Sequence, residues 1–266
     1  MPTTFWGWVV FFTKTYGKFF LQGAATTMYI SMVGTVVGFL IGLGVAVVRT
    51  IPIKDSDSKF RKFFFKVVQF IFVAYIEIFR GTPMIVQSMV IYYGLAELWN
   101  IDLTPTVAAL FIVSINTGAY MAEIARGGII SIDKGQYEAA ESIGMNHWQT
   151  MNTVILPQAI RNVLPSIGNE FVVNIKDTSV LNVISVTELF FLSKSAAGTY
   201  YKYFEVFFIT CVIYFVLTFT VTRILHAVEI RMDGPDTFII HGSQTVPEAI
   251  IKGVDDDKEE GSGGLH

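Results

Sequence analysis

Apolar segments long enough to cross a lipid bilayer recur along the chain, and short charged links separate them. The hydrocarbon core of a bilayer is about 30 Å thick, which about 20 helical residues can span. Hydrophobic residues make up 52% of the sequence and charged residues only 15%. A water-soluble protein of this length could not bury so much apolar surface. The pattern therefore predicts an all-α integral membrane protein.

We predict five transmembrane helices. Their approximate ranges are 19–48, 63–95, 105–130, 164–187 and 203–225. The second would measure about 50 Å as one straight helix with a rise of about 1.5 Å per residue, which is more than a bilayer requires. Because Gly81 and Pro83 interrupt it, we expect one broken helix, with six hydrophobic segments as the alternative.

Basic residues are distributed unevenly over the predicted links. The link between the first two spans carries six: Arg49, Lys54, Lys59, Arg61, Lys62 and Lys66. The next link, residues 96–104, carries none. Since cytoplasmic loops are enriched in Lys and Arg, the first link is expected in the cytoplasm. Five spans then place the N-terminus outside and the C-terminus inside the cell.

Three regions follow from these patterns. Residues 1–18 are rich in aromatic side chains, which is typical of a segment lying at the membrane interface. Residues 19–230 are expected to form the transmembrane domain. Residues 231–266 are interpreted as a polar, acidic, cytoplasmic tail whose last residues look like an artificial linker. Cys211 is the only cysteine, so no intrachain disulfide can form.

A polar island at about residues 131–163 separates the third and fourth spans. Glu138 begins a run that favours a helix, and Gly144 can end this helix in the left-handed conformation. Asn146 can cap a second helix that carries Trp148. Pro157 and Pro165 are expected to mark the return to the membrane. Such an island suits a docking surface for another protein, although an ordinary interfacial loop would share its local chemistry.

Polar side chains also fall inside the predicted spans, where ionisable groups are costly and are usually paired or functional. They include Glu77, Arg80 and Thr82 around the break, Ser114, Asn116 and Glu123 in the third span, and Asn169, Glu170, Asn174, Lys176, Asp177, Thr178 and Ser179 in the fourth. Structural ion pairs between Glu77 and Arg80 and between Lys176 and Asp177, and a helix end at Glu123 and Arg126, are the alternatives to a binding role.

Glycines recur every fourth residue in the first span, at Gly34, Gly38 and Gly42. This spacing lets two helices approach backbone to backbone. We expect packing within the chain, with a dimer or gate interface as the alternative.

Several motifs together resemble a known family. Glu138-Ala139-Ala140, Gly144 and Ile155-Leu156-Pro157 match the "EAA" loop of ATP-binding-cassette (ABC) importer permeases. Residues 79–83 (Phe-Arg-Gly-Thr-Pro), 119–128 and 176–179 (Lys-Asp-Thr-Ser) narrow the match. Over residues 20 to 230 the chain is similar to the polar amino acid permeases, relatives of the histidine, arginine, glutamine and cystine importers, which have the type I importer architecture.

The resemblance implies a permease subunit of the bacterial cytoplasmic membrane, without catalytic residues, metal or cofactor of its own. The sequence has no G-x-x-x-x-G-K-[ST] phosphate loop. ATP and Mg²⁺ would bind to two copies of a cytoplasmic ATPase subunit, an extracytoplasmic amino-acid-binding protein would deliver substrate, and a second permease copy or a paralogue would complete the pore. No nucleic acid is implied. The expected ATPase-coupling residues are Glu138, Ala139, Ala140, Gly144, Met145, Asn146 and Trp148.

The resemblance also implies a substrate site. Its expected residues are Thr82, Asn116, Glu170, Lys176, Asp177 and Ser179. Lys176 could bind the carboxylate of an amino acid and Asp177 its ammonium group, because charge-assisted hydrogen bonds are strong. Glu170 and Lys176 would point to different faces of a straight helix, so we expect a bend or an unwound turn that brings them to one cavity. Glu170 favours a cationic or amide side chain.

Two other classes of function stay open. A self-sufficient, ion-coupled secondary transporter would be expected to contain inverted repeats, which the sequence does not show. A membrane scaffold that transports nothing would not need polar groups within its spans.

Overall fold

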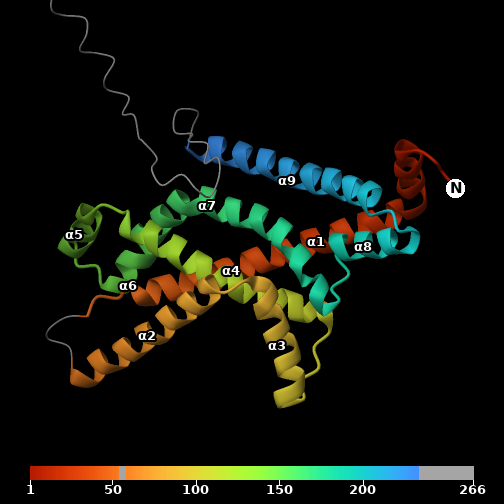
Figure 1. The fold of residues 1–266 in the computed structure, drawn as a ribbon. Helices are drawn as coiled ribbons and strands as arrows, with labels where there is room; N and C mark the ends of the chain where they lie inside the picture. Colours follow the sequence, from red (N-terminus) through yellow and green to blue (C-terminus); the bar gives the residue numbers. More distant parts are fainter. Residues whose placement is uncertain (54–57, 234–266) are drawn as a thin grey trace, which may run out of the picture. The chain divides into compact units, whose positions relative to one another are not determined.

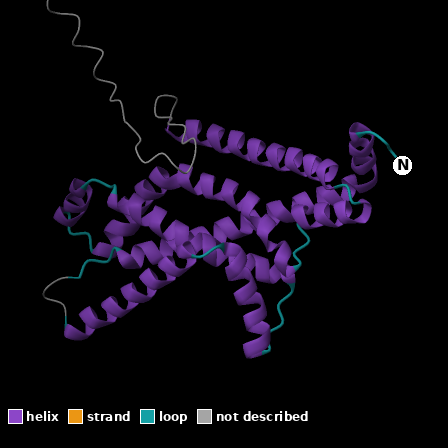
Figure 2. Ribbon diagram, in the orientation of Figure 1, coloured by secondary structure: helices purple, strands orange, loops and turns teal. Residues whose placement is uncertain are grey.

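The computed structural model describes residues 1–53 and 58–233. These residues form helices joined by short loops, and no strand occurs among them (Figure 2). The predicted all-α class is therefore confirmed. Residues Met1–Leu225 form one compact unit, and a second unit, His226–His266, begins within the last helix. Most of the predicted acidic tail lies outside the described residues.

The elements follow one another from the N-terminus (Figure 1). In chain order they are α1 (Phe5–Arg49), α2 (Lys59–Gly81), α3 (Met84–Trp99), α4 (Pro105–Ile130), α5 (Lys134–Ser142), α6 (His147–Thr150), a π-helical stretch (Met151–Ile155), α7 (Leu156–Asp177), a 3-10 helix (Thr178–Ile184), α8 (Leu189–Tyr200) and α9 (Tyr203–Asp233).

Among the described residues, three helices are long and apolar enough to cross a membrane: α1, α4 and α9. A fourth candidate is the segment His147–Ile184 followed by Leu189–Tyr200, which bends by 56°. The predicted break of the second span is confirmed, because α2 ends at Gly81 and α3 begins at Met84. The total of five spans stays a prediction. Pro165 lies inside α7 and does not precede it.

Close contact between α1 and α4 forms the centre of the unit Met1–Leu225. A Cβ atom added at Gly38 would lie 2.7 Å from Thr117 Cβ, and one added at Gly42 would lie 2.6 Å from the backbone nitrogen of Ala122. Both distances are shorter than a carbon atom tolerates, so only glycine fits. The predicted intrachain packing of the glycine repeat is thus confirmed.

Two further helices are attached to this pair by hydrogen bonds. Tyr75 of α2 donates to the backbone carbonyl of Ile115 in α4, at 2.6 Å. Asn174 of α7 donates to Thr35 Oγ1 of α1 at 2.8 Å and accepts from Thr117 Oγ1 of α4 at 3.1 Å. Asn174 is only 4% exposed. The polar atoms that join α1, α4 and α7 are therefore paired with one another inside an apolar core.

The first turns of α1 pack against α8 and α9. Trp8, Phe12 and Phe20 belong to one buried cluster with Leu189 of α8 and Val206 of α9. Phe12 is fully buried. The aromatic residues of the N-terminal segment thus contribute to the core of this unit. Their predicted position at the membrane interface stays a prediction.

The close approach of α1 and α4 can be tested by comparing two glycines of α1. Gly42→Val should lower the free energy of unfolding by about 1–3 kcal/mol, because the side chain would overlap the backbone of α4. Gly44→Val is the matched control, since a Cβ there meets no atom within 4 Å. Thermal unfolding of the purified protein in detergent measures both. Equal stability of the two variants would contradict the packing described here.

Candidate functional site

The break between α2 and α3 exposes backbone polar groups that need partners. Thr82 has an extended backbone (φ −126°, ψ 146°), as expected for a residue before proline, and ends α2. The Nε2 group of Gln87 donates to the carbonyl oxygens of Phe79 at 2.9 Å and Thr82 at 2.8 Å, and to Thr82 Oγ1 at 2.8 Å. One side chain from the first turn of α3 thus bridges the break.

Asn116 of α4 joins the same group. Its Nδ2 donates to Gln87 Oε1 at 2.8 Å and to the Phe79 carbonyl at 3.4 Å. The predicted site residues Thr82 and Asn116 are therefore brought together, and Gln87 connects them. Sequence reasoning did not select Gln87. Its position four residues after Pro83, on the face of α3 that points back to the break, is the only signal that could have indicated it.

The predicted residues of α7 lie close to the end of that helix. The backbone stays α-helical from Leu156 to Asp177 and becomes a 3-10 helix at Thr178. The expected bend between Glu170 and Lys176 is therefore wrong: the winding changes only after both residues. Glu170 instead shares a face of α7 with Asp177, the residue after Lys176. The two acidic residues lie about two helical turns apart. The two carboxylates interact electrostatically.

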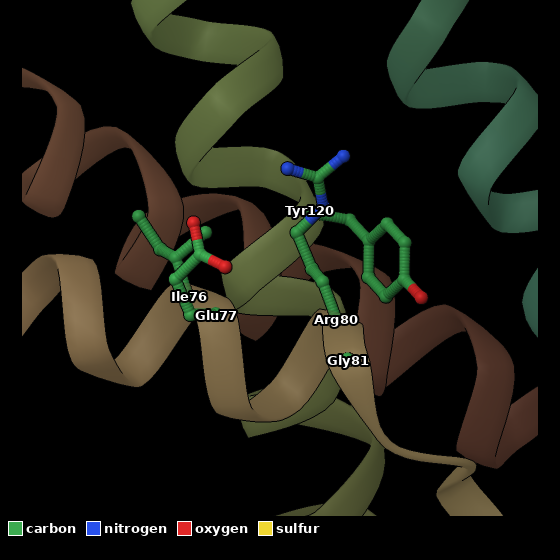
Figure 3. Close-up of a pocket in the computed structure, with 5 residues that line it drawn as sticks. All are labelled: Ile76, Glu77, Arg80, Gly81 and Tyr120. Atoms are coloured by element: carbon green, nitrogen blue, oxygen red, sulfur yellow. The ribbon is translucent and has the colours of Figure 1, made fainter.

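An open pocket of about 310 Å³ lies beside the break, lined by Ile76, Glu77, Arg80, Gly81 and Tyr120. Figure 3 shows the Glu77 carboxylate and the Arg80 guanidinium on the same side of α2, with the Tyr120 ring beside Arg80. The guanidinium carbon lies 5.5 Å from the centre of this ring. Arg80 also attracts the Glu170 carboxylate. Arg80 thus connects the pocket electrostatically with Glu170 of α7.

Among the described residues, the alternative interpretation as a helix end is confirmed at Glu123. Near the end of α4, Glu123 pairs with Arg126 of the same helix, at 3.0 Å, and with Arg49 of α1. This arrangement is expected for a helix end. No ion pair joins Glu77 to Arg80 in the part of the chain that the structure describes. Both side chains line the pocket.

Acidic side chains of this region do not form a metal site. Within residues 1–53 and 58–233, no group of three or more His, Cys, Asp or Glu side chains is placed to hold a metal ion. Glu170 and Asp177 instead have cationic neighbours, Arg80 and Lys176 respectively. The arrangement offers hydrogen-bond donors and acceptors of both charges, which suits a small polar solute.

The polar island folds into two short helices with a tight turn between them. Asp133 caps α5, and Gly144 adopts a positive φ of 80°, which confirms its predicted left-handed conformation. Asn146 caps α6: its Oδ1 accepts from the backbone of Gln149 at 3.0 Å, and Gln149 Oε1 accepts from the backbone of Asn146 at 2.9 Å. Reciprocal bonds of this kind fix the start of a helix.

The turn exposes apolar side chains at the protein surface. Ile143 is 77% exposed and Trp148 is 64% exposed, and Glu138, Ala139 and Gly144 are exposed as well. Ala140 differs from the other predicted coupling residues because it is buried, so it can support the docking face but cannot line it. Met145 and Asn146 lie at the edge of the turn; Met145 is partly exposed and Asn146 is exposed.

Glu188 is a buried acidic residue that sequence reasoning did not single out. Its carboxylate accepts from the backbone nitrogens of Phe190 at 2.8 Å and Phe191 at 2.7 Å, and from the Tyr214 hydroxyl at 3.0 Å. It thereby caps α8 and ties it to α9. An acidic residue directly before an apolar helix is a capping signal.

Comparison with known proteins places this architecture in a family. Residues 58–234 match the family described as "Binding-protein-dependent transport system inner membrane component". The chain belongs to this family. It is a polar amino acid ABC transporter permease, a multi-pass membrane subunit. The suspected resemblance is thus confirmed.

Two curated relatives illustrate the similarity. The chain is 36% identical over 213 residues to the glutamine transport system permease protein GlnP of Escherichia coli K12, covering 80% of this chain and 92% of the relative. It is 34% identical over 218 residues to the arginine transport system permease protein ArtQ of Bacillus subtilis 168, covering 82% and 94%.

Solved structures agree with this assignment. A crystal structure of an amino acid ABC transporter with histidines superposes with a TM-score of 0.73 and 35% identity, covering 87% of this chain and 100% of that chain. The inward-facing methionine ABC transporter MetNI superposes with a TM-score of 0.62 at 18% identity, which supports the fold alone.

The buried hydrogen bonds of Asn174 yield a stability prediction. Asn174→Leu should lower the free energy of unfolding by about 1–3 kcal/mol, because it leaves Thr35 and Thr117 without their partner. Asn169→Leu is the matched control, since Asn169 lies on the exposed side of the same helix. Thermal unfolding in detergent measures both. A control as unstable as Asn174→Leu would refute the assigned role.

Proposed function

We propose that this permease subunit imports polar amino acids by alternating access. An extracytoplasmic amino-acid-binding protein would deliver the substrate. The pore would consist of two copies of this permease, or of this chain and a paralogue. Two copies of a cytoplasmic ABC ATPase would dock on their α5–α6 turns. The ATPase would bind ATP and Mg²⁺. The observation that carries the proposal is the pocket beside the broken helix, whose Arg80 interacts electrostatically with Glu170 of α7, which in turn interacts with Asp177.

Charge complementarity supports this substrate path. A zwitterionic amino acid needs donors for its carboxylate and acceptors for its ammonium group, and both occur here. Lys176 and Arg80 supply cationic donors, while Asp177 and Glu170 supply acceptors. Ser179, at the start of the 3-10 helix, and the Thr82–Asn116 group would line the two ends of this region. Such groups are costly in a membrane unless they serve transport or pair with one another.

The names of the relatives give a direction for the side chain of the substrate. The similar permeases from Escherichia coli and Bacillus subtilis are named for glutamine and arginine transport. An acidic residue at position 170 can accept hydrogen bonds from a guanidinium and from an amide nitrogen. We therefore propose a cationic or amide amino acid as substrate.

The docking surface would consist of the exposed residues of the turn. Ile143 and Trp148 offer an apolar centre, and the Gly144 turn lets a partner approach the backbone. Large, exposed, apolar side chains framed by polar residues are typical of interaction sites. By the positive-inside rule, the basic residues at the start of α2 support a cytoplasmic position for this side of the membrane, which would also hold the C-terminus.

An ion-coupled secondary transporter is not favoured. Membership of the binding-protein-dependent family implies partner subunits that supply energy and substrate. A chain in this role needs no ATPase site of its own, in agreement with the missing phosphate loop.

The docking proposal predicts that Trp148→Ala weakens capture of the ATPase. Losing a central aromatic residue should reduce the affinity by about tenfold or more, because such residues dominate interfaces. Trp6→Ala is the matched control: Trp6 is 65% exposed, but lies at the start of α1. Co-purification with the cognate ATPase and coupled ATP hydrolysis are the measurements. Unchanged assembly and coupling in Trp148→Ala would count against docking at this turn.

The substrate proposal predicts that Glu170→Gln and Asp177→Asn slow import. Each removes one charged acceptor, which should reduce the uptake rate at saturating, amino-acid-loaded receptor by about tenfold or more. Glu205→Gln, at the exterior end of α9, is the control. Radiolabelled arginine and glutamine uptake into proteoliposomes gives the rates. Wild-type rates in both variants would exclude these carboxylates from the path.

A further inference from the structure

Gln87 joins the two halves of the broken span to α4 through a group of hydrogen bonds that we call the Gln87 clasp. It comprises Gln87, the carbonyl oxygens of Phe79 and Thr82, the Thr82 hydroxyl and the Asn116 amide. Gln87 is only 7% exposed. A buried amide with all its contacts inside the protein has its orientation determined by those contacts.

The chemistry of the clasp permits one orientation of each amide. The carbonyl oxygens of Phe79 and Thr82 can only accept hydrogen bonds, so Gln87 must turn its NH₂ group toward them. Its Oε1 then faces Asn116, which must turn its own NH₂ group toward Gln87 and Phe79. Asn116 Oδ1 consequently points away from the clasp. Among the described residues, none donates a hydrogen bond to Asn116 Oδ1.

The Thr82 hydroxyl also makes its hydrogen bonds within the protein. It donates to the Ile78 carbonyl at 2.8 Å and accepts from Gln87 Nε2 at 2.8 Å. Its single hydrogen is thus already used within the protein. Of the two predicted site residues in the clasp, only Asn116 has an unused polar atom that is strongly directed, and that atom is an acceptor.

We propose that Gln87 is a positioning residue for transport: it holds the Asn116 amide so that Oδ1 accepts a hydrogen bond from the α-ammonium group of the transported amino acid. This inference rests on the proposed function and deepens it. Asn116 and Tyr120 lie four residues apart on α4, so they share a face of that helix. Tyr120 lines the pocket and its ring lies beside the Arg80 guanidinium, so Asn116 lies one turn of α4 from the residue that contacts Arg80. The guanidinium would face the carboxylate of the same solute.

The test measures binding to the assembled permease–ATPase complex in nanodiscs without the receptor, so that the receptor's own selectivity does not enter. The probes are L-arginine and L-glutamine, together with their analogues that lack the α-amino group, 5-guanidinopentanoate and glutaramate. Gln87→Met removes every bond that Gln87 makes in the clasp. Gln87→Lys retains donors for the two carbonyl oxygens but cannot accept from Asn116, so it keeps the bonds across the break and removes the shorter of the two bonds that orient the Asn116 amide.

Both variants should weaken binding of the better-bound amino acid by about tenfold and leave binding of its deaminated analogue within about twofold of wild type. Asn116→Leu should give the same pattern, and adding Gln87→Met to Asn116→Leu should cause no further loss. Gln22→Met, an exposed glutamine of α1, is the control and should bind both probes normally.

Equal weakening of amino acid and analogue, or unchanged binding of both, in an assembled Gln87→Lys complex would overturn the positioning role. Where both Gln87 variants fail to assemble, Asn116→Leu decides: equal weakening of both probes overturns the proposal, and selective weakening supports it. A wild-type complex that binds none of the probes and imports no amino acid with its receptor and ATP would instead count against the proposed function itself.

Discussion

The approach of α1 to α4 through Gly34, Gly38 and Gly42 is the constraint on which the rest of the unit depends. Lipid tails are as apolar as leucine, so spanning helices gain little from burying apolar side chains against one another. Close backbone contact and internal hydrogen bonds replace that driving force. The glycines provide the contact. Hydrogen bonds of Tyr75 and Asn174 then attach α2 and α7, respectively, to α4. Each site described above is attached to this central pair.

Polar side chains gather wherever the helical backbone is interrupted. Inside a membrane, unpaired N–H and C=O groups cost several kcal/mol each, so a break persists only where partners satisfy it. Gln87 supplies them at the break between α2 and α3, and Glu188 supplies them at the start of α8. The breaks also bring charged groups into the spanning region. The same requirement thus stabilises the fold and creates the polar surroundings in which a solute can bind.

Local features could be predicted from the sequence, and long-range ones could not. The break at Pro83, the left-handed Gly144 and the Asn146 cap depend on a few neighbouring residues, whose conformational preferences are strong. The bonds of Asn174 to α1 and α4, and the bond between Gln87 and Asn116, join residues far apart in the chain, so a single sequence does not reveal these pairings. The bend expected between Glu170 and Lys176 was wrong because α7 keeps its winding to Asp177 and groups Glu170 with Asp177.

The α5–α6 turn and the charged cluster share one continuous helical path. It runs from α6 through the π-helical stretch and α7 to Asp177, so movement at Trp148 can be transmitted along it. The most direct test of this account is amino acid uptake into proteoliposomes that contain the purified permease. Uptake should require the ATPase subunit, ATP and the receptor together, and should be unaffected by collapse of ion gradients. Uptake by the permease alone, driven by an ion gradient, would contradict it.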